Sequence, residues 1–356
     1  MSKSVTPATP ANVHALATAL ALDEAAYERA LDLAQLRPQP DDWRRWFDRF
    51  LAAAGTLLIV AGITAFFAWN WADLHRMAKF ALVETGIVAA VLLAWRLQID
   101  STAGRAALFA GAFLVGVLLA VFGQVYQTGA DPHGLFLAWA LLVLPWALVG
   151  RQGGLWLLVV VLLDLALILY WIQVLHPPDG WWTLARLMGP LVWLASTATD
   201  SRLAGWLFAL NAGALIAWEF AASVGLTWLQ GRTTPRLLAL IALYTVFAPT
   251  LFFILVGIAE ARLDITMLSP VLFAAALAAG FGYYRYGKRD LFMLTAGLFG
   301  VIAVVMAFAS RALFEAVGGL FDGAGSLLLL AVLLVAQVGA AAWWLRRVAQ
   351  DWEGVS

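Results

Sequence analysis

The stretch LAAAGTLLIVAGITAFFAW, residues 51–69, is apolar throughout and is followed directly by the polar turn Asn-Trp-Ala-Asp at residues 70–73. A helix needs about 17–25 apolar residues to cross the hydrocarbon core of a bilayer, so this run is long enough. A second apolar run begins after Lys79, and two more follow on either side of GQVYQTGADPHG, residues 123–134. The pattern predicts an integral membrane protein.

The composition supports this prediction. Hydrophobic residues make up 63% of the chain and charged residues 12%, against about 45–50% and 25% in soluble domains. There is no cysteine, which excludes disulfides and thiolate chemistry. The net charge is zero, and no basic tail or basic helix indicates a nucleic-acid partner. We therefore expect the lipid bilayer to be the main surrounding of the chain.

Eleven apolar runs are candidates for membrane spans. They cover residues 51–69, 78–95, 106–126, 135–149, 154–175, 183–199, 203–222, 237–259, 267–284, 291–310 and 324–345. The run 135–149 is short unless its ends extend. The run 183–199 is the weakest, because it contains Arg186, a Gly-Pro pair and several hydroxyl residues.

The distribution of basic residues tests the number of spans. With eleven spans the basic residues from Arg37 onward divide ten and ten between the two sides, whereas inserted proteins keep an excess in the cytoplasm. If 183–199 does not cross, the later loops change sides, and most basic residues join the N-terminal side. The sequence therefore predicts an all-α polytopic bundle of about ten spans, with both termini in the cytoplasm.

A stripe of small residues ends in an amide. Ala112, Gly116, Ala120 and Gln124 recur every four residues, a spacing that brings helices close together in lipid. We expect Gln124 to point into the bundle. It serves there either as a satisfied amide at a packing face or as a contact to a substrate.

Two carboxylates fall inside apolar runs. Glu84 lies about a third of the way into its run, and Asp164 lies near the centre of GLWLLVVVLLDLALILYW. An ionised carboxylate there is costly, so each is either a proton- or cation-binding group or a buried carboxyl bonded to a neighbouring helix. Glu219 lies near the inner end of its run, where we expect it to reach the interface.

Other chemical motifs are missing from the sequence. His75, His133 and His176 fall in predicted outer loops without the spacing of a compact metal motif. There is no phosphate loop, nucleophile elbow or zinc-protease motif. We expect no cofactor, no metal and no enzymatic activity.

Two segments of the sequence resemble those of a known membrane-protein family. AGITAFFAWNWADLHRMAKFALVE, residues 61–84, and GQVYQTGADPHGLFLAWALLVLPWAL, residues 123–148, resemble the bacterial membrane family called domain of unknown function 2157. The match extends over about residues 15–175. Its matching positions are Gly62, Phe66, Ala68, Asn70, Trp71, Lys79, Gln124, Tyr126, Trp139 and Pro145. The resemblance implies a multi-pass protein of the bacterial inner membrane, without known catalytic or binding residues.

The chain divides into five segments in this interpretation. Residues 1–40 form a cytoplasmic amphipathic helical segment and residues 41–50 an interfacial helix. Residues 51–150 are the family-like unit of four spans. Residues 151–346 form the further spans, and residues 347–356 a cytoplasmic tail.

The outer halves of the first four runs share polar and aromatic residues, which we call the outer cluster. Its members are Trp69, Asn70, Trp71, Asp73, Lys79, Glu84, Gln124, Tyr126, Gln127 and Asp131. We predict that it forms a periplasm-facing pocket or a face that docks a membrane or periplasmic protein. A scaffold or accessory subunit is therefore our first functional hypothesis.

Two other functions stay open. A small-solute or proton-coupled transporter would use Glu84 and Asp164, and the helix breaks at Gly189-Pro190 and Ala248-Pro249 favour it. A membrane sensor would act through the N-terminal segment.

Overall fold

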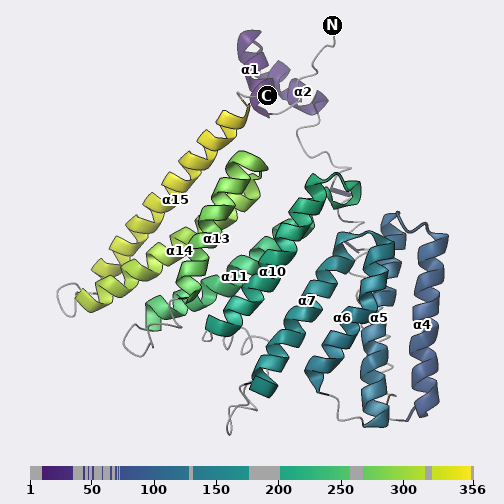
Figure 1. The fold of residues 1–356 in the computed structure, drawn as a ribbon. Helices are drawn as coiled ribbons and strands as arrows, with labels where there is room; N and C mark the ends of the chain where they lie inside the picture. Colours follow the sequence, from purple (N-terminus) through teal and green to yellow (C-terminus); the bar gives the residue numbers. More distant parts are fainter. Residues whose placement is uncertain are drawn as a thin grey trace. The chain divides into compact units, whose positions relative to one another are not determined.

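The computed structural model describes residues 10–34, 73–127, 131–175, 201–256, 268–316 and 323–353, with residues 43, 44, 47, 50, 51, 58, 65, 69 and 71. The chain divides into two compact units, Met1–His75 and Arg76–Ser356. Regular secondary structure in the described residues is entirely helical (Figure 1). This confirms the all-α prediction.

The first unit begins with two short helices, α1 (Pro10–Ala19) and α2 (Glu24–Leu33). Asp23 separates them and caps α2, since its carboxylate accepts a hydrogen bond from the Ala26 amide at 2.7 Å. The N-terminal segment therefore contains two short helices with a break at this residue. The predicted interfacial helix 41–50 and the first apolar run 51–69 lie mostly outside the described residues.

The second unit opens with four helices packed in chain order (Figure 1). They are α4 (Arg76–Arg96), α5 (Thr102–Tyr126), α6 (Pro132–Gly150) and α7 (Gly153–Tyr170), which continues as the π-helix η1 (Trp171–Leu175). The run 135–149 does extend, to the 19 residues of α6. In the core of this group Trp139 donates a hydrogen bond from its indole nitrogen to the Ala112 carbonyl at 3.0 Å.

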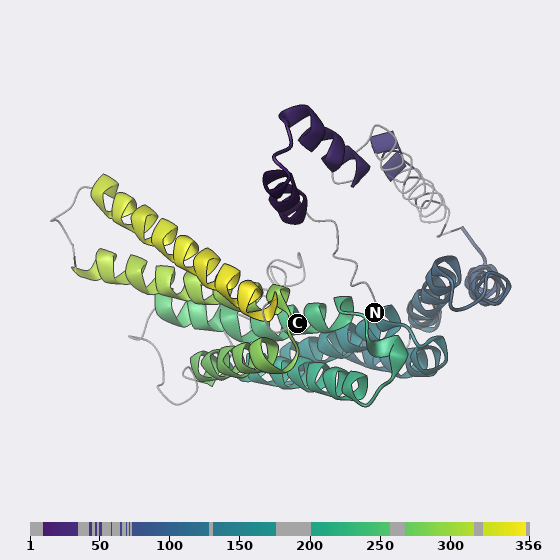
Figure 2. The same ribbon diagram turned by 90° about the horizontal axis from the view of Figure 1, so that it is seen from above.

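The remaining helices form a second group. They are α10 (Ser201–Ser223), α11 (Thr233–Val256), α13 (Leu268–Gly282), α14 (Leu291–Ala316) and α15 (Gly323–Glu353), with the 3₁₀ turn η2 (Thr227–Leu229) and the π-helix η3 (Tyr283–Gly287). The views from the side and from above both place α15 beside α14 (Figures 1 and 2).

Eight helices among the described residues are long and apolar enough to cross a membrane. Each corresponds to one of the eleven predicted runs. A ninth run, 267–284, corresponds to α13, which has 15 residues before it continues into η3. The run 183–199 lies outside the described residues.

The two groups meet along α7 and α10, which run antiparallel. Trp171, near the end of α7, packs against Leu203 at the start of α10. Val160, in the first half of α7, packs against Trp218 near the end of α10. Leu175 and Ser201 therefore lie at the same end of the bundle. The ten-span prediction requires this, because in that prediction residues 183–199 do not cross the membrane.

With this arrangement of the helices, most basic residues of the second unit lie at one end of the bundle. Fourteen Lys and Arg side chains occur in the described part of the second unit, and ten of them lie at one end, which we call the basic end. These ten are Arg96, Arg105, Arg151, Arg232, Arg236, Arg285, Lys288, Arg289, Arg346 and Arg347. The opposite end holds Arg76, Lys79, Arg202 and Arg311. The charge asymmetry is that of an inserted membrane protein.

Candidate functional site

The predicted outer cluster is divided between the two units. Trp69, Trp71 and Asp73 belong to the first unit, and Asn70 lies outside the described residues. The six other members belong to the second unit, at or near the end opposite the basic end. There, Tyr126 packs its ring against those of Phe80 and Phe122, with centroids 6.1 and 4.8 Å away. These rings pack α4 against α5 at the end opposite the basic end.

The outer-cluster members of the second unit face outward. Glu84, Gln124, Tyr126, Gln127 and Asp131 are exposed, and Lys79 is half-buried. The prediction that Gln124 points into the bundle is therefore wrong.

The reason is geometric. Residues four apart on an α-helix turn by about 40° relative to one another, so a four-residue repeat rotates by roughly 120° over twelve residues. Ala112 and Gly116 are buried, whereas Ala120 and Gln124 have rotated to the surface. A Cβ atom on Gly116 would lie 2.3 Å from the Trp139 ring. The first half of the stripe therefore does pack closely.

Asp164 and Asn211 form a buried polar pair in the middle of the bundle. The Asn211 side-chain nitrogen donates to an Asp164 carboxylate oxygen at 2.8 Å and to the Leu207 carbonyl at 3.0 Å. Of the two alternatives that the sequence left open for Asp164, the structure shows the buried carboxyl bonded to a neighbouring helix. The sequence signal for Asn211 was a single amide within the apolar run 203–222.

The largest polar assembly among the described residues lies at the basic end, and the sequence analysis did not predict it. We call it the charge network: Glu219, Arg232, Arg236, Tyr284, Lys288 and Asp290. Glu219 is only 6% exposed, so its carboxylate is enclosed by other side chains. Its carboxylate accepts hydrogen bonds from Arg232 at 2.8 Å, Lys288 at 2.8 Å and the Tyr284 hydroxyl at 3.2 Å.

Asp290 is the second acidic centre of the charge network. Its carboxylate accepts from Arg232 Nε at 2.9 Å and from Arg236 Nη2 at 3.0 Å. It also accepts from the Phe292 amide at 3.0 Å, at the start of α14. Arg232 bonds both carboxylates, so this single guanidinium joins the end of α10 to the start of α14.

The arginines set the ionisation of Asp290. Burial by itself raises the pKa of this carboxyl, but the hydrogen bonds and charges of Arg236 and Arg232 outweigh burial and lower its pKa below the ordinary value. For Arg232, burial favours the neutral form, but Glu219 and Asp290 outweigh it and raise the pKa of the guanidinium. The pair is therefore fully charged at neutral pH.

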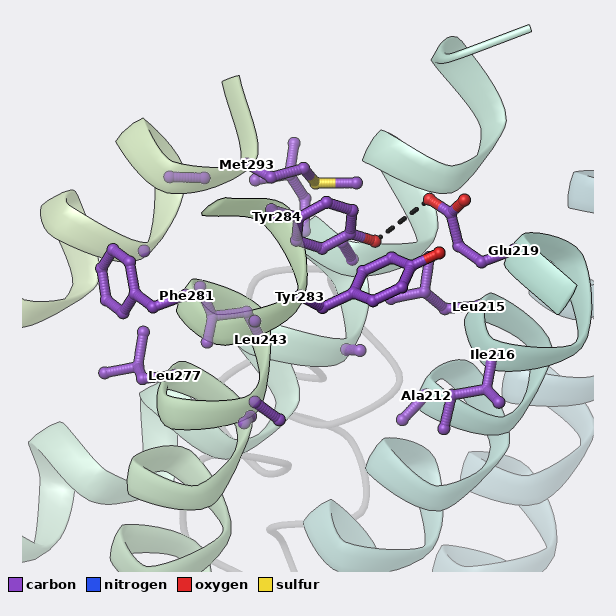
Figure 3. A pocket seen from close by; sticks show the side chains of 18 of the residues that line it. Ala212, Leu215, Ile216, Glu219, Leu243, Leu277, Phe281, Tyr283, Tyr284 and Met293 are labelled. Atoms are coloured by element: carbon purple, nitrogen blue, oxygen red, sulfur yellow. Dashed lines mark hydrogen bonds between the residues drawn. The ribbon is translucent and has the colours of Figure 1, made fainter. Parts of the chain in front are cut away.

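A cavity of about 580 Å³ opens beside the charge network, between α10, α11, α13 and α14. We call it the α10–α14 cavity. Most of its lining is apolar, while the polar side chains of Glu219, Tyr283 and Tyr284 gather at one end (Figure 3). The sequence signal for this end was the segment YYRYGKRD, residues 283–290, which combines tyrosines, basic residues and an acid.

The predicted histidines do not come together. His75 is exposed, His133 lies in the first turn of α6 beside Tyr170, and His176 lies outside the described residues. His133 is therefore helical and not in a loop as predicted. Within the described ranges no group of three or more His, Asp or Glu side chains is arranged to hold a metal ion.

Comparison with known proteins supports the resemblance seen in the sequence. Residues 14–156 match the family model described as "Predicted membrane protein (DUF2157)". No curated protein and no solved structure matches the chain. The charge network and the α10–α14 cavity lie C-terminal to the matched residues.

Proposed function

We propose that this multi-pass membrane protein is a non-enzymatic scaffold or accessory subunit that docks a partner through the outward face of α4. Glu84 is the observation that carries the proposal. It lies eight residues into α4, about 12 Å along the helix axis, and its side chain is exposed. An ionised carboxylate that faces lipid at this depth costs at least about 2.5–3.5 kcal/mol, so a polar partner is favoured.

The surroundings of Glu84 support close docking. Ala81, Thr85 and Ala89 are also exposed and recur every four residues beside Glu84. Small residues at this spacing let a second helix approach closely, and a hydroxyl adds a hydrogen bond across the interface. The partner is therefore expected to contribute a membrane helix with a hydrogen-bond donor or a basic residue.

The proposed location is the bacterial inner membrane, with the N-terminus and the basic end in the cytoplasm. The support is the ten-to-four distribution of basic side chains in the second unit, together with the positive-inside rule. In this orientation the outer cluster faces the periplasm.

Site-specific photocrosslinking in cells tests the docking proposal. A photoreactive residue at Val88, one turn from Glu84 and 56% exposed, should give an adduct heavier than the chain. The same group at Leu328 of α15, 66% exposed, is the control for lipid-facing positions. Glu84→Leu should abolish the Val88 adduct. Crosslinks that form only within the chain would contradict docking of a partner.

A proton-coupled transporter that uses Glu84 and Asp164 is the second candidate, and the Asp164–Asn211 hydrogen bond in mid-bundle favours it. Asp164→Asn should then stop transport without loss of protein. It ranks lower because neither Asp164 nor Asn211 lines the α10–α14 cavity. A sensor acting through residues 1–40 is the third candidate and would use the α1–α2 pair.

A further inference from the structure

We propose that the α10–α14 cavity binds one anionic phospholipid of the surrounding membrane. In this arrangement an acyl chain fills the apolar part of the cavity, and the phosphate lies against Lys288 and Arg236 of the charge network. This binding site is independent of the proposed docking face on α4.

The cavity has the volume and the lining for an acyl chain. Its volume of about 580 Å³ lies within the range of small-molecule sites, which is roughly 300–1,000 Å³. Leu215, Leu243, Leu277 and Phe281 line its walls. Ile216 and Phe220 at its margin are 69% and 70% exposed. The cavity therefore opens sideways on the surface that faces lipid.

The cavity has open space beside Gly280. This residue lines the cavity, and no atom lies within 4 Å of the position that a Cβ would take. A larger side chain at this position would extend into the empty volume without a clash. Gly213 of α10 also has nothing within 4 Å, but it does not line the cavity.

Glu219 is the member of the charge network that lines the cavity and carries a charge, and the network joined to it has an excess of positive charge. Glu219 and Asp290 contribute two negative charges, and Arg232, Arg236 and Lys288 contribute three positive charges. One net positive charge therefore lies next to an apolar cavity. This complementarity selects an amphiphile with an anionic head over a cationic or neutral one.

Hydrogen-bond donors are also in excess. Lys288 carries three N–H groups and uses one of them on Glu219 at 2.8 Å. Arg236 bonds Asp290 through Nε and Nη2, which leaves Nη1 for another acceptor. The two side chains are 35% and 38% exposed. Phosphate oxygens are strong acceptors for such groups.

The position in the membrane agrees with this ligand. The charge network belongs to the basic end, which the positive-inside rule assigns to the cytoplasm. Anionic lipids of the cytoplasmic leaflet attract basic groups at that surface. A headgroup at Lys288 would lie at the membrane interface, with its chain directed along the cavity into the bilayer.

Native mass spectrometry of the purified full-length chain tests the proposal. The protein is delipidated in mild detergent and titrated with phosphatidylglycerol or with phosphatidylethanolamine. Wild type should bind one phosphatidylglycerol with about tenfold preference, the change that one charge-assisted hydrogen bond supplies. Gly280→Leu should abolish this binding, and the matched Gly213→Leu should leave it unchanged.

The headgroup contact has its own pair of variants. Lys288→Gln should remove the preference for phosphatidylglycerol. Arg347→Gln removes the same charge from the basic end, outside the charge network, and should keep the preference. Equal binding of the two lipids by wild type, or equal binding by the Gly280→Leu and Gly213→Leu proteins, would overturn the proposal.

Discussion

The two helix groups of the second unit use polar residues in opposite ways. In α4–α7, the Glu84 side chain is exposed, and Asp164 is buried. In α10–α15, Glu219 and Asp290 are buried and bonded to three basic side chains. The first group thus keeps the Glu84 carboxylate at its surface, whereas the second uses its carboxylates to join its own helices. The role of a carboxylate in an apolar run therefore cannot be assigned until it is known whether the side chain is buried in the bundle or exposed at its surface.

The largest expected effect concerns the buried carboxylates of the second group. Asp290→Ala should lower the free energy of unfolding by about 3–5 kcal/mol, because two arginines lose their buried partner. The side chain of Asp290 is 2% exposed. Thermal unfolding in detergent measures the change. A loss below about 1 kcal/mol would mean that the charge network does not hold α10 to α14.

The packing of the first group gives the next effect. Gly116→Leu should destabilise the protein by about 1–3 kcal/mol, because the added side chain overlaps the Trp139 ring. Gly213→Leu is the control, since its position is open. The same unfolding measurement applies. Equal stability of the two variants would show that α5 and α6 are not in close contact.

A smaller effect follows from pH. The pKa of folded Asp290 lies below its ordinary value of 3.8, so its ion pairs stabilise the fold above that pH. This stabilisation should disappear as the pH falls through the lowered pKa. In Asp290→Asn the acid-dependent part should be absent. The difference in melting temperature between wild type and variant, followed from pH 7 to acid, measures it; a constant difference would contradict the ion pairing.

The smallest effect on stability is expected at Glu84. Glu84→Leu should change the unfolding free energy of the isolated protein by no more than about 0.5 kcal/mol, as for other surface substitutions. It should nevertheless abolish the Val88 crosslink. A strong destabilisation of the isolated chain would show that Glu84 belongs to its core and is not a docking residue.

Much of the fold could be predicted from the apolar runs and from the positions of the basic residues. The helices of the second unit and the common end of Leu175 and Ser201 agree with those predictions. The charge network did not follow, because Glu219 and Asp290 are joined only in three dimensions, through Arg232. Gln124 was misplaced because a four-residue repeat drifts around the helix. Patterns along the chain locate helices, but helix rotation and loop convergence decide which side chains meet.

The division of roles between the two groups is tested most directly by native mass spectrometry of the protein extracted with its membrane. Wild type should appear with a partner protein and one anionic lipid. Glu84→Leu should lose the partner and keep the lipid, while Gly280→Leu should lose the lipid and keep the partner. Loss of both together in either variant, or of neither in both, would contradict the account.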